Sequence, residues 1–190
     1  MIIGISGKKR SGKDTVYQLI RKDIAYRGKF FIARAAFGDD IKEEVAKATG
    51  KSLAHIEENK ERFRPILQWW GADFRRHYEG ENYWLDRMQR KMSSIRDPEV
   101  LVITDVRYPN EADLVKSFGG IMIRVKRETG LEDPHSSENL LDYYEDFDYW
   151  LNNDGTLENL ENQVAQIVED QCCATPDFRV EAGAAAASGT

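Results

Sequence analysis

The chain has 190 residues, enough for one well-buried domain and too few for two full domains. Its formal net charge is −6, from 27 Lys and Arg against 33 Asp and Glu, which weighs against a protein that coats nucleic acid. No run of 18 or more apolar residues is present, and the apolar N-terminal stretch lacks the basic region of a signal peptide. We therefore expect a cytoplasmic protein with no membrane and no nucleic acid among its partners.

Short apolar runs alternate with amphipathic stretches along the chain, a pattern typical of an α/β protein with a parallel sheet. The expected strands are 1–6, 30–37, 100–105, 121–125 and 149–152. The expected helices are 12–26, 40–48, 65–78, 83–95, 110–118 and 157–170. Residues 171–190 contain a run of small residues and are expected to form a disordered tail outside the domain. The adjacent Cys172 and Cys173 suit neither a disulfide framework nor a zinc site.

The stretch "GKKRSGKDT", residues 7 to 15, lies between the first expected strand and the first expected helix. Gly7 permits the turn, Gly12 permits close approach of the backbone, and Lys13 reaches the β- and γ-phosphates of a nucleotide. Residues 8 to 29 carry eight Lys or Arg against two Asp, so positive potential is concentrated around this loop. The pattern predicts a phosphate-binding loop; an idle glycine-rich turn is the alternative.

Asp14 stands where such loops usually have Ser or Thr, whose hydroxyl holds Mg²⁺. A carboxylate is also a hard oxygen ligand, directly or through water, so Asp14 at this position need not abolish metal binding. The alternative is a charge favoured at a helix N-terminus by the helix dipole. The hydroxyl of Thr15 is expected to meet another phosphate oxygen.

The segment "RPILQWWGADFRR" supplies a polar stripe at helical spacing, formed by Arg64, Gln68, Gly71 and Arg75. Glycine inside a helix costs about 1 kcal/mol relative to alanine, so a functional reason is expected for it. We interpret Gly71 as a gap against which a planar or charged small molecule lies. A surface stripe with an incidental glycine is the competing interpretation.

Further polar residues follow the expected strands, at the edge where open α/β sheets bind ligands. Asp105 suits Mg²⁺ through water, and Arg107 suits a phosphate group. "AFGDDIK" adds Asp39 and Lys42. The loop after strand 121–125 begins with Arg127 and is expected to close over the site, although a solvated surface loop would look similar.

In chain order, "GKKRSGKDT", "FGDDIK", "RPILQWWGADFRR", "ITDVRYPNEAD", "HSSE" and "NNDGTLENL" resemble the phage-type deoxynucleoside monophosphate kinases, in the adenylate-kinase-like group of P-loop kinases. The resemblance covers residues 1 to about 170. It implies one domain with a five-stranded parallel sheet flanked by helices. It also implies a monophosphate-binding helical region at about 39–96 and a lid at about 127–139.

The resemblance further implies ATP and Mg²⁺ as donor and a deoxynucleoside monophosphate as acceptor, with a deoxynucleoside diphosphate as product. The implied ATP-site residues are Lys9, Arg10, Ser11, Gly12, Lys13, Asp14, Thr15, Arg124, Asn153 and Gly155. The implied acceptor residues are Asp39, Lys42, Arg64, Gln68, Arg75 and Arg107. The candidate metal ligands are Asp14 and Asp105. The catalytic candidates are Lys13, Arg107 and Arg127, with Arg124 and His135 as the other candidates for the lid residue that acts.

Phosphoryl transfer to a phosphate requires positioning and charge stabilisation, and the acceptor oxygen is already ionised at neutral pH, so no general base is expected. Two alternatives stay open. One is another small-molecule kinase of the same fold, acting on dephospho-CoA or phosphomevalonate. The other is a nucleotide-responsive regulator without turnover. A monomer and a homodimer are both compatible with the sequence.

Overall fold

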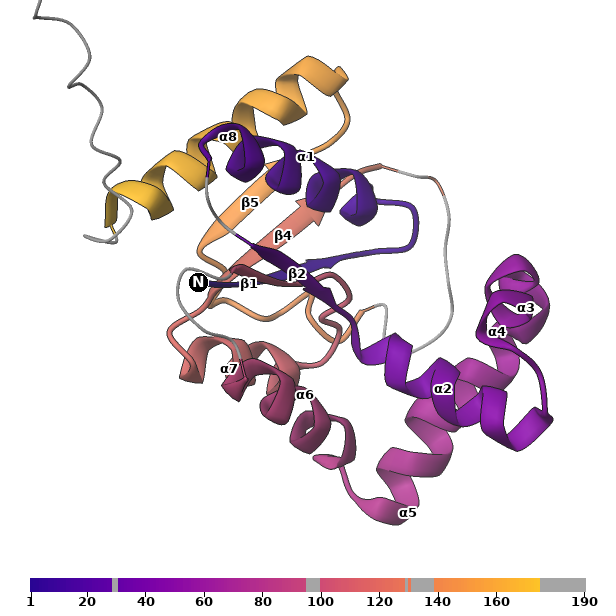
Figure 1. The fold of residues 1–190 in the computed structure, drawn as a ribbon. Helices are drawn as coiled ribbons and strands as arrows, with labels where there is room; N and C mark the ends of the chain where they lie inside the picture. Colours follow the sequence, from indigo (N-terminus) through magenta and orange to yellow (C-terminus); the bar gives the residue numbers. More distant parts are fainter. Residues whose placement is uncertain (29–30, 95–99, 129, 131–138, 175–190) are drawn as a thin grey trace, which may run out of the picture.

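The computed structural model describes residues 1–28, 31–94, 100–128, 130 and 139–174. Its centre is a five-stranded, all-parallel sheet with the order β2-β3-β1-β4-β5, which confirms the predicted sheet (Figure 1). The strands are β1 (Ile2–Gly7), β2 (Ile32–Ala35), β3 (Val100–Ile103), β4 (Ile121–Lys126) and β5 (Tyr149–Asn152). Because all run the same way, their C-terminal ends meet at one edge, where the functional loops begin.

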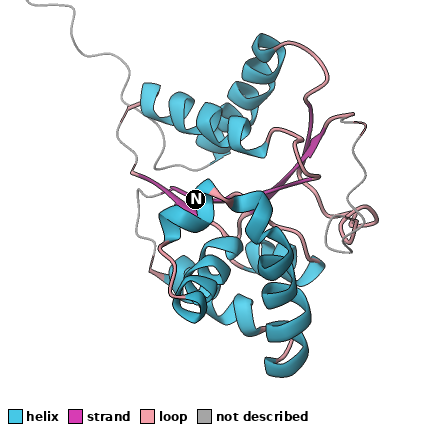
Figure 2. Ribbon diagram, turned by 90° about the vertical axis from the view of Figure 1, so that its right-hand side faces the viewer, coloured by secondary structure: helices cyan, strands magenta, loops and turns pink. Residues whose placement is uncertain are grey.

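Helices cover both faces of the sheet, as Figure 2 shows. One face carries α1 (Lys13–Tyr26) and α8 (Leu157–Ala174), and the other carries α6 (Tyr83–Ser93) and α7 (Pro109–Ser117) (Figure 1). Successive strand residues alternate between the two cores. Ile3 and Ile5 pack with α1 and α8, whereas Ile2 packs in the second core with Trp84, Met88 and Met92 of α6.

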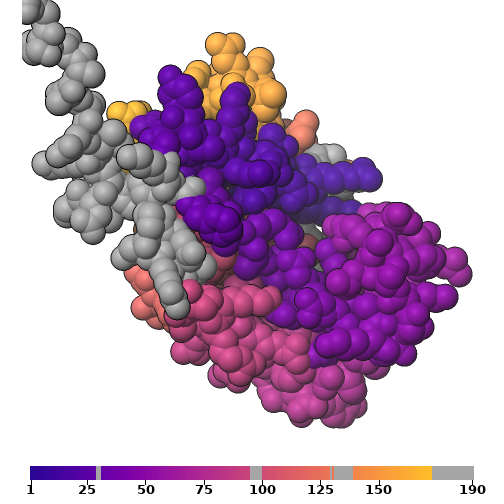
Figure 3. Space-filling model, viewed as in Figure 1, coloured from indigo at the N-terminus to yellow at the C-terminus, as the bar shows by residue number. Residues whose placement is uncertain are grey.

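A group of helices between β2 and α6 forms a lobe beside the sheet (Figure 3). It consists of α2 (Phe37–Thr49), α3 (Leu53–Glu58), α4 (Lys60–Gln68), the π-helix η1 (Trp69–Arg76) and α5 (His77–Glu79). A small cluster of Val45, Ala46 and Ile56 holds α2 and α3 together. The expected regular helix over 65–78 is therefore wrong in its middle, where eight residues are π-helical. The short helix α3 was not expected either.

The expected end of the domain at residue 170 and the expected lid at about 127–139 both lie next to residues that the structure does not describe. Helix α8 reaches Ala174, four residues beyond the expected end of the domain. Most of the expected lid, residues 129 and 131–138, lies outside the described residues, as does 175–190. None of the described helices is long and apolar enough to cross a membrane.

Candidate active site

The glycine loop joins the end of β1 to the start of α1, as predicted. Gly12 has a left-handed backbone with φ of 98°, and a Cβ at this position would collide with the side-chain amide of Asn153. That amide donates a 2.8 Å hydrogen bond to the carbonyl oxygen of Ser11. Glycine is therefore required at position 12 by backbone conformation and by packing.

Two side chains of the loop are arranged as a phosphate site requires. The Lys13 ammonium donates to the carbonyl oxygens of Gly7 and Lys8, at 2.5 and 2.8 Å, so it lies across the loop. The Ser11 hydroxyl is buried and is one of two such side-chain polar atoms without a hydrogen-bond partner in the described part of the chain. A loop with no Cβ at Gly12, an ammonium and a buried hydroxyl fits the phosphates of a nucleotide.

Asp105 follows β3 and binds the first turn of α2. Its two carboxylate oxygens accept 2.8 Å hydrogen bonds from the backbone N–H groups of Phe37 and Gly38. These donors have no partner within their own helix, and a negative charge is favoured at a helix N-terminus. The carboxylate thus ties the lobe to the sheet edge, a role that the sequence analysis did not anticipate.

A cavity of about 370 Å³ opens between the glycine loop and the lobe. Nine cationic side chains line it against five carboxylates, so it favours an anionic ligand. The cations are Lys9, Arg10, Lys13, Arg34, Lys42, Lys60, Arg64, Arg76 and Arg107, and the acids are Asp14, Asp39, Glu61, Asp105 and Glu111. The neutral Gln68 and Gly71 also line it. The structure thus brings five of the six predicted acceptor residues, both predicted metal ligands and four of the ten predicted ATP-site residues to one cavity.

Several predicted residues lie outside the lining of this cavity. They are Ser11, Gly12, Thr15, Arg75, Arg124, Arg127, Asn153 and Gly155. Arg124 is buried in β4, where its guanidinium donates to Ser6 Oγ at 2.9 Å and to Asp142 and lies over the Phe147 ring. It therefore supports the sheet from inside. Arg127 is exposed just beyond β4.

Asp39 and Lys42 lie on α2 beside a cation that the sequence analysis missed. The Arg34 guanidinium, from β2, donates to Asp39 at 2.8 Å. The Lys42 ammonium is 3.6 Å from Asp39 and 2.7 Å from Glu57. Arg34 lies near the C-terminal end of an expected strand, and this position would have indicated it as a candidate site residue.

The π-helix changes which arginine reaches the cavity. Arg75, predicted on the stripe of Gly71, is bound to Glu44 at 2.7 Å, away from the lining. Its neighbour Arg76 lines the cavity and pairs with Glu111, which is buried. A Cβ on Gly71 would collide with the side chain of Ile41, so packing against α2 gives a structural reason for this glycine.

Asp14 and Asp105 are the predicted metal ligands in this cavity. Asp14 is exposed, and the described residues contain no group of three or more His, Cys, Asp or Glu side chains arranged to hold a metal. Mg²⁺ is commonly bound by one or two carboxylates together with substrate phosphates and water. The donor set therefore fits a magnesium ion that arrives with its nucleotide.

Comparison with known proteins agrees with this geometry. The family model described as deoxynucleotide monophosphate kinase matches residues 16–164. A protein of Acanthamoeba polyphaga mimivirus, named "Putative deoxynucleotide monophosphate kinase", is 26% identical over 195 residues, covering 90% of this chain and 97% of its own.

Among solved structures, the protein called APE1195 has a TM-score of 0.52 at 14% identity, with 90% of this chain and 95% of its own covered. Shikimate kinase from Aquifex aeolicus has a TM-score of 0.49 at 18% identity, with coverage of 92% and 100%. At such identities, the likeness to APE1195 concerns the fold alone. From the family match over most of its length, the chain belongs to the deoxynucleotide monophosphate kinase family and is a nucleotide-dependent phosphotransferase.

Proposed function

We propose that the protein transfers the γ-phosphoryl group of ATP to a deoxynucleoside monophosphate, giving ADP and a deoxynucleoside diphosphate. The observation that carries this proposal is the single cation-rich cavity shared by the glycine loop and the helical lobe. One nucleotide on the loop would not require cations on α2 and α4. A second anionic ligand accounts for them.

On the donor side, the loop from Lys9 to Thr15 binds the ATP phosphates. Lys13 exchanges its bonds to the loop carbonyls for the β- and γ-phosphates. Asn153 and Gly155 form the adenine-side loop after β5. Asp14 and Asp105 would hold Mg²⁺, which neutralises charge on the phosphates when bound.

On the acceptor side, the proposed residues are Asp39, Lys42, Arg64, Gln68 and Arg107. An oxygen of the acceptor phosphate forms a bond to the γ-phosphorus, the bond from that phosphorus to the β–γ bridging oxygen breaks, and its electron pair leaves with ADP. The cations stabilise charge on the transferring group, and the attacking oxygen needs no base. Arg127, exposed beyond β4, is the proposed lid cation.

A coupled ADP-release assay with ATP and Mg²⁺ tests this function. The acceptors are dTMP, dGMP, dCMP and dAMP, their ribose counterparts, dephospho-CoA and phosphomevalonate. Release dependent on one or more deoxynucleotides, and weak with the ribose forms, is the expected result. Release with dephospho-CoA or phosphomevalonate alone would identify another kinase of this fold. ATP binding without release would favour a regulator.

A further inference from the structure

The π-helix η1 has wider spacing than an α-helix, since its hydrogen bonds join residues five apart rather than four. Gly71 and Arg76 are five apart, and both line the cavity. In an α-helix, Arg75 would share the face of Gly71. The π-helical register brings Arg76 toward the face of Gly71, where it lines the cavity, whereas Arg75 lies outside the lining and binds Glu44. Short π-helical segments are frequent at functional sites.

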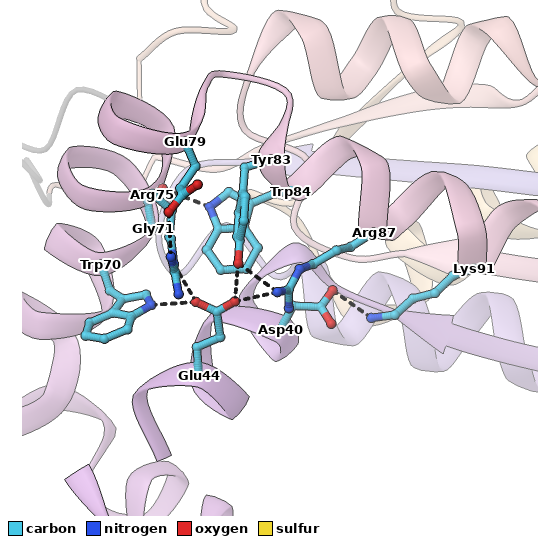
Figure 4. A network of polar contacts seen from close by, with 10 residues as sticks. All are labelled: Asp40, Glu44, Trp70, Gly71, Arg75, Glu79, Tyr83, Trp84, Arg87 and Lys91. Atoms are coloured by element: carbon cyan, nitrogen blue, oxygen red, sulfur yellow. Dashed lines mark hydrogen bonds and ion pairs between the residues drawn. The ribbon is translucent and has the colours of Figure 1, made fainter. Parts of the chain in front are cut away.

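Glu44 of α2 binds Arg75 (Figure 4). Its carboxylate accepts hydrogen bonds from Trp70 Nε1 at 2.9 Å, Arg75 Nε at 2.7 Å and the Tyr83 hydroxyl at 2.6 Å. Arg87 forms an ion pair with it at 2.6 Å. Donors from η1 and α6 thus converge on one carboxylate, which fixes η1 against both neighbouring helices.

Trp84 adds a contact inside the π-helical segment. Its indole Nε1–H, in the core, donates a 2.9 Å hydrogen bond to the carbonyl oxygen of Gly71. A side-chain donor to a backbone carbonyl helps to satisfy a helix whose own hydrogen-bond ladder is altered. Together with the Glu44 cluster, it anchors the register of η1 from two sides (Figure 4).

Arg76 is held from the cavity side by a buried partner. Its guanidinium pairs with Glu111, donates to the carbonyl oxygen of Glu81 at 3.0 Å and lies 3.8 Å from the centre of the Tyr108 ring. The Arg76 and Glu111 side chains are 9% and 2% exposed. Glu111 also accepts the backbone N–H groups of Arg107 and Tyr108, at 2.8 and 3.2 Å, and is thereby fixed to the start of α7.

A guanidinium has five N–H donors, and the bonds to Glu111 and Glu81 engage two of them. Above about pH 7, the raised pKa of the buried Glu111 carboxyl, both groups are ionised and the Arg76–Glu111 pair has no net charge. Its remaining donors therefore suit a neutral hydrogen-bond acceptor better than they suit a phosphate dianion. The base of the acceptor nucleotide carries such neutral acceptors, whereas its phosphate matches the other cations of the cavity.

We propose that Arg76 hydrogen-bonds the base of the acceptor nucleotide, and that Glu111 is the positioning residue that holds its guanidinium toward the cavity. This inference rests on the proposed function, since it names the contact that the same site makes with the base. The arginine of η1 that binds the acceptor is then Arg76, which lines the cavity, and not Arg75.

The test compares binding of deoxynucleoside monophosphates with binding of deoxyribose 5-phosphate, which lacks a base. Removing Arg76 alone would leave Glu111 buried and unpaired, so the double variant R76M/E111Q is used beside R76K, which keeps the charge but not the planar fork. Dissociation constants are measured by calorimetry or competition, without turnover. Both variants are expected to weaken nucleotide binding about 10-fold and to change deoxyribose 5-phosphate binding less than about 2-fold.

R75M is the matched control, because it removes the adjacent arginine of the same π-helix, which lies outside the cavity lining. It is expected to lower the unfolding temperature and to leave the acceptor KM within about 2-fold of wild type. E111Q is expected to raise the acceptor KM while kcat and the ATP KM stay within about 2-fold.

Three results would overturn the assignment of Arg76. The first is that the Arg76 variants bind the nucleotide and the sugar phosphate equally less tightly, and the second is that they bind both as tightly as the wild type. The third is an effect of R75M on nucleotide binding as large as that of R76K. Failure of the wild type to bind any deoxynucleoside monophosphate would also overturn it. If the wild type binds deoxynucleoside monophosphates but does not phosphorylate them, the proposed kinase activity is refuted. The dissociation constants of the Arg76 variants still test the contact with the base in that case.

Discussion

Asn153 and Ser11 are 142 positions apart in the chain, yet the side-chain amide of Asn153 donates a 2.8 Å hydrogen bond to the Ser11 carbonyl oxygen. The same amide occupies the place where a Cβ on Gly12 would project. The loop that follows β5 therefore packs directly on the glycine loop. The two segments act as one unit of the proposed ATP site.

This contact predicts coupling between positions 12 and 153. G12A is expected to weaken ATP binding at least about 10-fold, because the new methyl group collides with Asn153 and the backbone is strained at positive φ. N153A is expected to weaken it less. The double variant should bind ATP better than G12A alone, since the collision is gone while the strain stays. Calorimetric titration of the four proteins measures the coupling, with N162A on the exposed surface of α8 as control. Strict additivity would contradict the packing argument.

Lys13 is expected to act on the rate rather than on the fold. K13M removes a charge aimed at the transferring phosphoryl group and should lower kcat by on the order of 100-fold or more. The unfolding temperature should change by only a few degrees, since the ammonium binds carbonyl oxygens of the loop itself. Steady-state kinetics and thermal unfolding check the two statements. K22M is the control, because Lys22 lies on the same helix with its side chain 74% exposed. Near-full activity of K13M would remove the loop from the mechanism.

Asp105 accepts hydrogen bonds from the start of α2 and is also a proposed Mg²⁺ ligand. The variant D105N tests the first role by its stability and the second by its Mg²⁺ dependence. The variant keeps one carbonyl oxygen for the amides of Phe37 and Gly38 but loses the second acceptor and the charge. A loss of about 1–2 kcal/mol in unfolding free energy is expected from the weakened helix cap. A higher Mg²⁺ concentration for half-maximal activity is expected from the metal contact.

D14N is the partner experiment, because the Asp14 side chain is exposed. It should shift the Mg²⁺ requirement with little change in stability. An unchanged Mg²⁺ dependence in D105N would show that Asp105 serves only as the helix cap.

The regular parts of this protein could be predicted from its sequence because their signals are local. Apolar runs gave the five strands, and the glycine spacing gave the loop before α1. The π-helix could not be predicted, since nothing in "WWGADFRR" marks a change from α-helical to π-helical spacing. That single change exchanges Arg75 for Arg76 at the cavity. The partners of Arg124 show the same limit: the contacts of its guanidinium with Ser6 and Asp142 can be seen only in the structure.

Glu44 should stabilise the lobe more at neutral than at acid pH. Burial raises the pKa of its carboxyl, but hydrogen bonds from Trp70, Tyr83 and Arg75 outweigh burial and hold it below the ordinary 4.5. A depressed pKa contributes stability above the unfolded value, and that contribution is lost as the pH falls through the folded value. E44Q is therefore expected to be about 2 kcal/mol less stable than wild type at pH 7. The difference should shrink below pH 4.5. Urea unfolding across this range measures it, with the exposed E58Q as control.

Glu111 should behave in the opposite sense. Burial raises the pKa of its carboxyl to about 7, against the opposing effects of the Arg76 guanidinium and the backbone N–H groups of Arg107 and Tyr108, and the nearby Asp105 carboxylate adds to the rise. Between the unfolded value of 4.5 and about 7, the folded protein binds more protons at this site, so stability falls as the pH rises.

The measurement is the difference in unfolding free energy between wild type and E111Q, which cannot titrate at this position. We expect wild type to lose about 3 kcal/mol relative to E111Q from pH 4.5 to above pH 7, with a plateau beyond. Other groups that titrate in this range contribute equally to both proteins and cancel. A difference that stays flat with pH would mean that Glu111 is ionised throughout. The ion pair with Arg76 would then be intact at every pH tested.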